Sequence, residues 1–250
     1  MTKRPEPLHR FRHSEISSMK TPFFSILRLE SSFPRPIGDS ANPQTHPFAV
    51  RVSLVEDADV DRVIYDGAKG LVTNFVQKAK VQIGQGAIAV GTSCGFLFEH
   101  QNDLQSQIEV PFVSSSLTML TADLAEPIAV LSFDGELLSH AAWFKKACLG
   151  LEKIVVGGIP KVGHLFSVIR KNQTELNLKV AETEVVGSAI ALARLCIERF
   201  GLPPRTLLLE CTNLGVYRIA IQKAFNDCRY ECKLIDYNDV MARCWNTLQK

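Results

Sequence analysis

The sequence predicts an α/β protein built from two similar halves whose sheets are mostly parallel. Short apolar runs of strand length alternate with amphipathic stretches of helical periodicity along the chain. Strands that alternate with helices form parallel sheets, which are buried on both faces. In addition, two strand-to-helix junctions, at Cys94 and Cys211, share one pattern of an apolar run, a small or hydroxylated residue beside a cysteine, and then an amphipathic stretch. One structural theme is therefore expected to occur twice.

The composition is that of a soluble globular protein, with 46% hydrophobic and 22% charged residues. The net charge of +2 gives no strong attraction to nucleic acid or to an anionic membrane. No apolar run reaches the roughly 18–20 residues that span a bilayer, and no secretory segment follows the basic N-terminus. We therefore expect a cytoplasmic protein without nucleic-acid or membrane partners. Seven cysteines, an odd number, favour reduced thiols over a disulfide framework.

The first domain is expected over residues 23–123, after a basic, aperiodic and disordered tail at residues 1–22. Its loop at 31–47 carries four prolines, and long loops at strand ends are often functional. Apolar residues at helical spacing predict a helix from about 59 to 80. The expected elements are a strand at 23–29, that loop, a strand at 48–55, that helix, a strand before Cys94, a helix at 96–104, a strand at 109–113 and a helix capped by 114–116.

The second domain is expected over residues 124–236. Its longest helix, at 178–200, has an apolar face and is ended by Gly201 and Pro203. The expected elements are strands at 128–133, 153–157, 205–209 and 232–235, and helices at 137–148, 163–170, 178–200 and 214–225. A C-terminal helix at 237–250 closes the chain, and packing back on the first domain is one option for it. Both domains are interpreted as flavodoxin-like.

Both cysteines lie where a ligand is expected to bind. In open parallel sheets, ligands bind beyond the carboxyl ends of the strands. If the halves face each other, Cys94 and Cys211 face one cleft, which places the active site between the domains. A thiol at a helix N-terminus has a lowered pKa, and the free N–H groups there attract a carboxylate. One thiolate can then remove a proton from a carbon while the opposite thiol returns one, which inverts the stereocentre.

Proton removal from carbon requires hydrogen bonds that stabilise the carbanion in a site largely free of water. Ser114 is interpreted as a helix cap that also offers a ligand contact, and Asp39 either as an Asx-turn residue or as a group that polarises the Cys94 thiol. The expected donors are the hydroxyls of Thr92, Ser93 and Thr212 and the backbone N–H groups of Gly95, Phe96, Thr212 and Asn213.

Three motifs resemble the aspartate/glutamate/hydantoin racemase superfamily: residues 91–95 (GTSCG), 210–214 (ECTNL) and the loop 36–43 (PIGDSANP). The resemblance covers about residues 24–245. It implies racemases and epimerases that use paired cysteines between two similar domains and need neither pyridoxal phosphate nor another cofactor. It also implies a homodimer by analogy.

Transferred to this chain, the resemblance implies that the two cysteines are the acid/base residues. It implies that Thr212 and Asn213 line the substrate site and that the loop residues Asp39, Ser40 and Asn42 lie near it. The implied reaction is inversion of the α-carbon of a small carboxylate-bearing compound, with an amino acid as the first expectation.

The chain departs from this pattern after the first cysteine. Gly95 and Phe96 stand where amino-acid racemases of this type have Asn-Thr. Alternatives are therefore a hydantoin-racemase-like enzyme, a maleate-isomerase-like enzyme that uses one thiol as a nucleophile, and a non-catalytic binding protein with the same cleft. No metal site is predicted, because Cys228, Cys232 and Cys244 lack Cys-x2-Cys spacing and nearby histidines.

Overall fold

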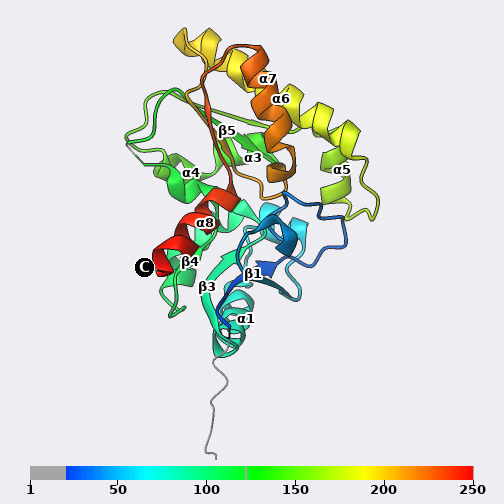
Figure 1. Ribbon diagram of the computed structural model, residues 1–250, viewed down its shortest axis with the longest axis vertical. Helices are drawn as coiled ribbons and strands as arrows, with labels where there is room; N and C mark the ends of the chain where they lie inside the picture. The colour runs from blue at the N-terminus through cyan, green and yellow to red at the C-terminus, as the bar shows by residue number, and fades with distance from the viewer. Residues whose placement is uncertain (1–20, 122, 250) are drawn as a thin grey trace, which may run out of the picture.

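A computed structural model describes residues 21–121 and 123–249 and shows two α/β halves joined end to end (Figure 1). Each half contains a four-stranded sheet in which all strands are parallel. The strand order is β2-β1-β3-β4 in the first sheet and β6-β5-β7-β8 in the second. Because the two orders are equivalent, the predicted α/β class with two similar domains is confirmed. The tail expected at residues 1–22 lies, over residues 1–20, outside the described residues.

The first half holds the elements up to residue 119, where η marks short 3-10 helices and, for η2, a π-helix. They are β1 (Phe23–Arg28), η1 (Pro43–Thr45), β2 (Val50–Leu54), η2 (Asp61–Tyr65), α1 (Val72–Gly84), β3 (Ala87–Thr92), η3 (Gly95–His100), α2 (Gln101–Gln105), β4 (Phe112–Val113) and η4 (Ser116–Met119). The strands β1 and β3 are almost entirely buried, as expected for the middle of a sheet covered on both faces.

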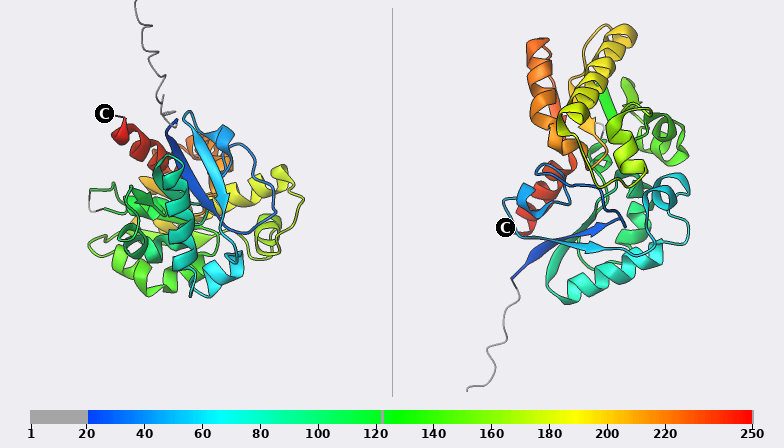
Figure 2. Two further views of the ribbon diagram at one scale, coloured as in Figure 1. Left: turned by 90° about the horizontal axis from the view of Figure 1, so that it is seen from below. Right: turned by 90° about the vertical axis from the view of Figure 1, so that its right-hand side faces the viewer.

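The second half holds the longer helices, and α6 and α7 lie side by side at the end of the molecule away from α1 (Figure 2). Its elements are β5 (Ile128–Ser132), α3 (Gly135–His140), α4 (Ala142–Ala147), β6 (Ile154–Gly158), α5 (His164–Arg170), α6 (Leu178–Phe200), β7 (Thr206–Leu209), η5 (Leu214–Tyr217), α7 (Arg218–Asp227), β8 (Lys233–Ile235) and α8 (Tyr237–Leu248). No helix among the described residues combines the length and the apolarity needed to cross a membrane.

The helix expected from about 59 to 80 is wrong as a single element. The structure has the π-turn η2, then a turn, then α1 to residue 84. Gly67 and Gly70 adopt positive φ angles of 63° and 77°, and Ala68, which lies between them, adopts one of 52°. A left-handed backbone ends a right-handed helix, so the apolar spacing continues through a point where the backbone turns.

The helix expected at 137–148 is also divided, into α3 and α4, at Ala141, whose backbone is extended. Its start is earlier than expected because the Asp134 side chain caps α3 by accepting a hydrogen bond from the Leu137 N–H at 3.1 Å. At the other end, His140 Nδ1 donates to the Glu136 carbonyl at 2.7 Å and satisfies one of the last carbonyl groups of α3.

The C-terminal helix α8 packs against the first sheet. Its Tyr237, Val240 and Met241 are buried with Phe24 and other residues of β1 and β3. Figure 1 shows this helix beside β3 and β4 rather than among the helices of the second half. The last residues of the chain therefore cover the sheet that carries Cys94.

Tyr237 enters the first sheet at a position that only glycine permits. A Cβ on Gly91 would lie 2.1 Å from the Tyr237 hydroxyl oxygen. That hydroxyl accepts a hydrogen bond from the Thr92 N–H at 3.0 Å and donates one to the Val113 carbonyl. The hydroxyl thus joins the ends of β3 and β4 two residues before Cys94.

We predict that Tyr237→Phe lowers the free energy of unfolding by about 1–3 kcal/mol, because it leaves a buried N–H and a buried carbonyl without a partner. Urea denaturation followed by circular dichroism measures the change. Tyr230→Phe is the matched control, since the Tyr230 hydroxyl makes no hydrogen bond with a described residue. Equal effects of the two substitutions would contradict the role assigned to the Tyr237 hydroxyl.

Candidate active site

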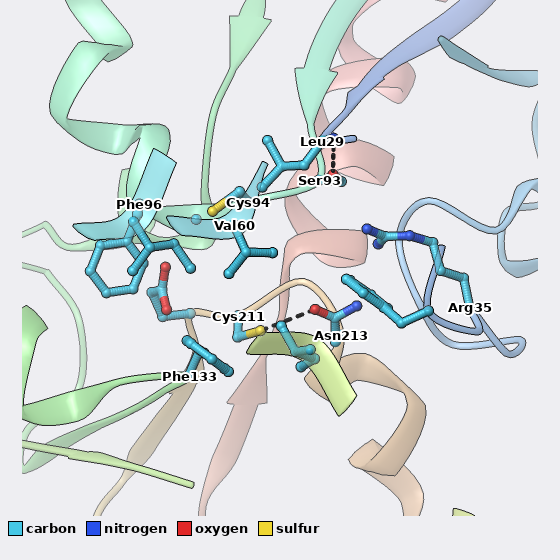
Figure 3. A pocket seen from close by; sticks show the side chains of 14 residues that line it. Leu29, Arg35, Val60, Ser93, Cys94, Phe96, Phe133, Cys211 and Asn213 are labelled. Carbon is cyan, nitrogen blue, oxygen red and sulfur yellow. Dashed lines mark hydrogen bonds between the residues drawn. The ribbon is translucent and has the colours of Figure 1, made fainter. Parts of the chain in front are cut away.

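The two cysteines follow equivalent strands, Cys94 after β3 and Cys211 after β7. Their sulfur atoms lie on opposite sides of one pocket between the halves (Figure 3). The residues that line this pocket are Leu29, Phe33, Arg35, Val60, Ile64, Ser93, Cys94, Gly95, Phe96, Phe133, Ile169, Glu210, Cys211 and Asn213.

The pocket is closed. It leaves about 20 Å³ for the centre of a water-sized molecule, and one buried water needs roughly 10–15 Å³ by the same measure. This form of the protein therefore has room for a water molecule or two between the thiols. A substrate larger than that requires the two halves, or the loop at 31–47, to move apart.

The surroundings of both thiols favour the protonated form. Burial, followed by the negative charge of Glu210, raises the pKa of Cys94 to about 12, although backbone N–H groups of Phe96 and Leu97 act in the opposite direction. Burial and Glu210 also raise the pKa of Cys211 well above its usual value, and Cys94 adds to this effect. The expectation of a lowered thiol pKa is thus wrong, because burial beside a carboxylate outweighs the helix N-termini.

The carboxylate responsible, Glu210, is fully buried. Its Oε2 accepts a hydrogen bond from the Ser132 hydroxyl at 2.7 Å, whereas its Oε1 has no hydrogen-bond partner among the described residues. Burial raises the pKa of Glu210 to about 7, against hydrogen bonds from Ser132 and the Phe133 amide. Glu210 is therefore a buried acid that titrates near neutral pH.

Glu210 also explains the glycine that follows the first cysteine. A Cβ on Gly95 would lie 2.1 Å from Glu210 Oε1 and 2.5 Å from the Glu210 carbonyl oxygen. Since real Cβ contacts are longer than 3 Å, no larger side chain fits at residue 95 while Glu210 holds this position. The Gly95-Phe96 pair and Glu210 thus form one arrangement.

The second cysteine is connected to the loop after β1 by a chain of polar contacts. The Cys211 thiol donates to Asn213 Oδ1 at 3.4 Å, and Asn213 Nδ2 donates to Asp39 Oδ2 at 2.5 Å. Asp39 also holds Arg35, whose Nη1 lies 3.1 Å from Asp39 Oδ1. Arg35 and Asn213 lie together on one side of the pocket, and Phe96 lies on the other (Figure 3).

Asp39 forms the Asx turn that was one of its two interpretations, because its Oδ1 accepts a hydrogen bond from the Ala41 N–H at 2.7 Å. Its carboxylate contacts Arg35 and Asn213 and lies behind them, in the lining of a smaller neighbouring cavity. Through these contacts Asp39 orients Asn213, which is the hydrogen-bond partner of Cys211. The other interpretation of Asp39 was that it polarises the Cys94 thiol. Asn42 supports the same loop, since its Nδ2 donates to the Arg35 carbonyl at 2.9 Å.

Four of the expected substrate-binding residues line the pocket beside the cysteines: Ser93, Gly95, Phe96 and Asn213. The others lie outside its lining and make hydrogen bonds to the backbone or to nearby side chains. These are Asp39 and Asn42, described above, and Ser40, Thr92, Ser114 and Thr212.

The last four hydroxyls hold the cysteine turns in place. Thr92 Oγ1 donates to the Ser114 carbonyl at 2.9 Å, and Ser114 Oγ donates to a side-chain oxygen of Gln101 at 2.7 Å. Thr212 Oγ1 donates to the Ser93 carbonyl at 2.7 Å, and Ser40 Oγ donates to the Thr212 carbonyl at 3.4 Å. The turns after β3 and β7 are thereby bonded to each other across the two halves.

Arg35 and Glu210 line the pocket but were not predicted as site residues. The sequence signal for Glu210 is a charged residue directly after the apolar run of β7, where a buried strand ends. Arg35 gave no such signal, because it is one of several polar residues in a long loop. The apolar side chains of Phe33 and Phe133 were also not predicted to line the pocket, since Phe33 stands in the long loop at 31–47 and Phe133 ends an ordinary apolar strand pattern.

No model of a known protein family matches the chain. Among curated proteins, it is similar to dimethylsulfoniopropionate lyases 7 and 5 of Emiliania huxleyi, with 23% identity over 81% of the chain and 25% over 84%. The chain spans only 62% and 43% of the length of these relatives.

Among solved structures, allantoin racemase from Klebsiella pneumoniae is 13% identical with a TM-score of 0.55, covering 92% of this chain and 88% of that one. An aspartate racemase homologue from Pyrococcus horikoshii OT3 is 12% identical with a TM-score of 0.54, covering 93% and 100%. A mutant of arylmalonate decarboxylase in the liganded form is 14% identical with a TM-score of 0.53, covering 92% of both chains. The chain has the fold of the aspartate/glutamate/hydantoin racemase superfamily.

Proposed function

We propose that the protein is a cofactor-independent racemase or epimerase that inverts the carbon beside the carboxylate of a small compound, with an amino acid as the first candidate. One observation carries this proposal: the thiols of Cys94 and Cys211 lie on opposite sides of a single closed pocket. The fold similarity to aspartate and allantoin racemases supports it.

In this mechanism one cysteine acts as a thiolate and the other as a thiol. The thiolate takes the proton from the α-carbon on one face, and the opposite thiol gives its proton to the other face, so that the two cysteines exchange protonation states. Backbone N–H groups of Phe96 and Leu97 at Cys94, and of Asn213 at Cys211, favour each thiolate when it forms. The apolar lining keeps water from the carbanion.

A lyase is the second candidate, because the curated relatives are named dimethylsulfoniopropionate lyases. Removal of the same α-proton begins this reaction. The electron pair of the broken C–H bond forms a carbon–carbon double bond and expels dimethyl sulfide from the adjacent carbon, which leaves acrylate and a protonated cysteine. Elimination needs one base only, whereas inversion needs both thiols.

We predict that Cys94→Ala and Cys211→Ala each lower racemisation by about 10²–10⁴-fold, the usual contribution of a general acid or base. Polarimetry and the uptake of deuterium at the α-carbon in deuterated water measure the reaction. Cys228→Ala is the control, since this thiol is exposed and lies outside the pocket. Racemisation at the wild-type rate in either pocket variant would rule out the two-thiol mechanism.

The reaction type is decided by a substrate panel. We predict that the wild-type protein reduces the optical rotation of an amino acid or a hydantoin and releases no volatile sulfide from dimethylsulfoniopropionate. Polarimetry and gas chromatography measure the two outcomes. Release of dimethyl sulfide, abolished by one cysteine substitution and tolerant of the other, would assign the lyase reaction instead. Binding without proton exchange on every compound would leave only a binding protein.

A further inference from the structure

We propose that the pocket selects a small zwitterion, whose carboxylate meets Arg35 and whose ammonium or sulfonium group meets Glu210. The inference rests on the proposed function in one respect, namely that the substrate occupies the pocket between the two thiols. It adds a role in charge recognition for Arg35 and Glu210, to which the sequence motifs assigned no binding role.

Arg35 offers a hydrogen-bond donor that nothing in the described chain uses. Its side chain is 7% exposed, and its Nε is buried without a partner among the described residues. The other guanidinium nitrogens are held in place, Nη1 by Asp39 at 3.1 and 3.3 Å and Nη2 by the Ser31 hydroxyl at 3.1 Å. The guanidinium carbon also lies 4.5 Å from the centre of the Phe33 ring. A fixed N–H at the pocket wall suits a carboxylate.

Glu210 offers the complementary acceptor. Its Oε1 is buried without a partner among the described residues, and the residue lines the same pocket. Glu210 packs on Gly95, next to Phe96, whereas Arg35 lies on the opposite side of the pocket (Figure 3). The rings of Phe33, Phe96 and Phe133 line the space as well, and aromatic faces attract cations. The acceptor and the donor thus stand apart, as the two ends of a zwitterion require.

The charge balance favours a zwitterion over a simple anion. Asp39 already neutralises Arg35, so a ligand with a carboxylate alone would add a negative charge to a pocket that contains Glu210. A ligand that also has a cationic group supplies a positive partner for the Glu210 carboxylate. Such a ligand adds no net charge to the pocket and pairs its cationic group with Glu210, whereas a simple anion would add a second negative charge that nothing balances.

Occupancy of this kind would also activate the thiols. The negative charge of Glu210 is the second-largest cause of the raised pKa of both Cys94 and Cys211, after burial. A cationic group beside Glu210 offsets that charge and lowers the pKa of both thiols. Thiolate formation is thereby linked to the binding of a substrate of the right charge.

Two pairs of probes test the inference, each a zwitterion and a carboxylate of the same shape in which carbon replaces the cationic atom. One pair is 3-(trimethylammonio)propionate and 4,4-dimethylpentanoate, and the other is alanine and isobutyrate. Isothermal titration calorimetry on the full chain should show at least tenfold tighter binding of the zwitterion in one pair. The pair that shows it distinguishes an onium group on the β-carbon from an ammonium group on the α-carbon.

Glu210→Gln should abolish this preference without weakening the binding of the carbon isostere, because the amide keeps the shape of the carboxylate and loses its charge. Glu198→Gln, on the exposed face of α6, is the matched control and should retain the preference. Arg35→Gln should weaken both members of the pair, since each carries a carboxylate. Circular dichroism confirms that each variant is folded.

The preference should also rise as the pH increases from 6 to 8 in the wild-type protein, because the pKa of Glu210 is raised to about 7 and only its ionised form attracts a cation. The other groups that face Glu210 are the thiols of Cys94 and Cys211, the Ser132 hydroxyl and the Phe133 amide. Both thiols stay protonated across this range, and the hydroxyl and amide do not titrate. In Glu210→Gln the profile should be flat.

Three results would overturn the inference: equal affinity for both members of each pair, a preference that persists in Glu210→Gln, or no binding of any probe. Failure of the proposed function has a different signature. In that case the zwitterion preference persists, while the α-proton of bound alanine does not exchange with deuterated water.

Discussion

A carboxylate buried beside two thiols is the constraint on which the candidate site depends. Glu210 follows directly on a fully buried strand, so its side chain enters the interior between the halves. Its position leaves room only for glycine at residue 95. Its charge, added to burial, raises the pKa of Cys94 and of Cys211 and favours their protonated forms. Glu210 therefore accounts both for the glycine at residue 95 and for the raised pKa of both thiols.

The docking of the two halves supplies the rest of the geometry. The loop after β1 reaches the turn after β7 through Arg35, Asp39 and Asn213, and the last of these accepts the hydrogen bond of Cys211. The turns themselves are joined by the bond from Thr212 to the Ser93 carbonyl. Neither cysteine is positioned by its own half alone. The relative position of the two thiols thus depends on how the two halves pack together.

Much of this architecture is predictable from the sequence, because it follows from local patterns. Buried parallel strands give short apolar runs, and the repeated junctions at Cys94 and Cys211 indicate equivalent positions in two sheets. The divided helix at 59–84 was missed because apolar spacing continues across Gly67 and Gly70, while the positive φ angles there are a property of the folded backbone. Local pattern identifies an element better than it locates a break in it.

The roles of polar residues were less predictable, because they depend on contacts between distant segments. Thr92 and Thr212 follow strands in the expected way, yet their hydroxyls donate to backbone carbonyls that only the folded chain brings near. Arg35 reaches the pocket from a long loop, and the Glu210 side chain fits at the pocket because the residue that packs against it, Gly95, has no Cβ. The motifs therefore predicted the two cysteine turns that line the candidate pocket, and tertiary contacts determine which other side chains line it.

The most direct test of this account is the pKa of the two thiols with and without the charge of Glu210. The rate of alkylation by iodoacetamide, followed at each cysteine by mass spectrometry as a function of pH, measures both values in the same sample. The account predicts that Glu210→Gln lowers the pKa of Cys94 and of Cys211 together and leaves the alkylation rate of the exposed Cys228 as it is in the wild-type protein. Unchanged values for both pocket thiols, or a change at one of them alone, would contradict the arrangement of one carboxylate acting on two facing thiols.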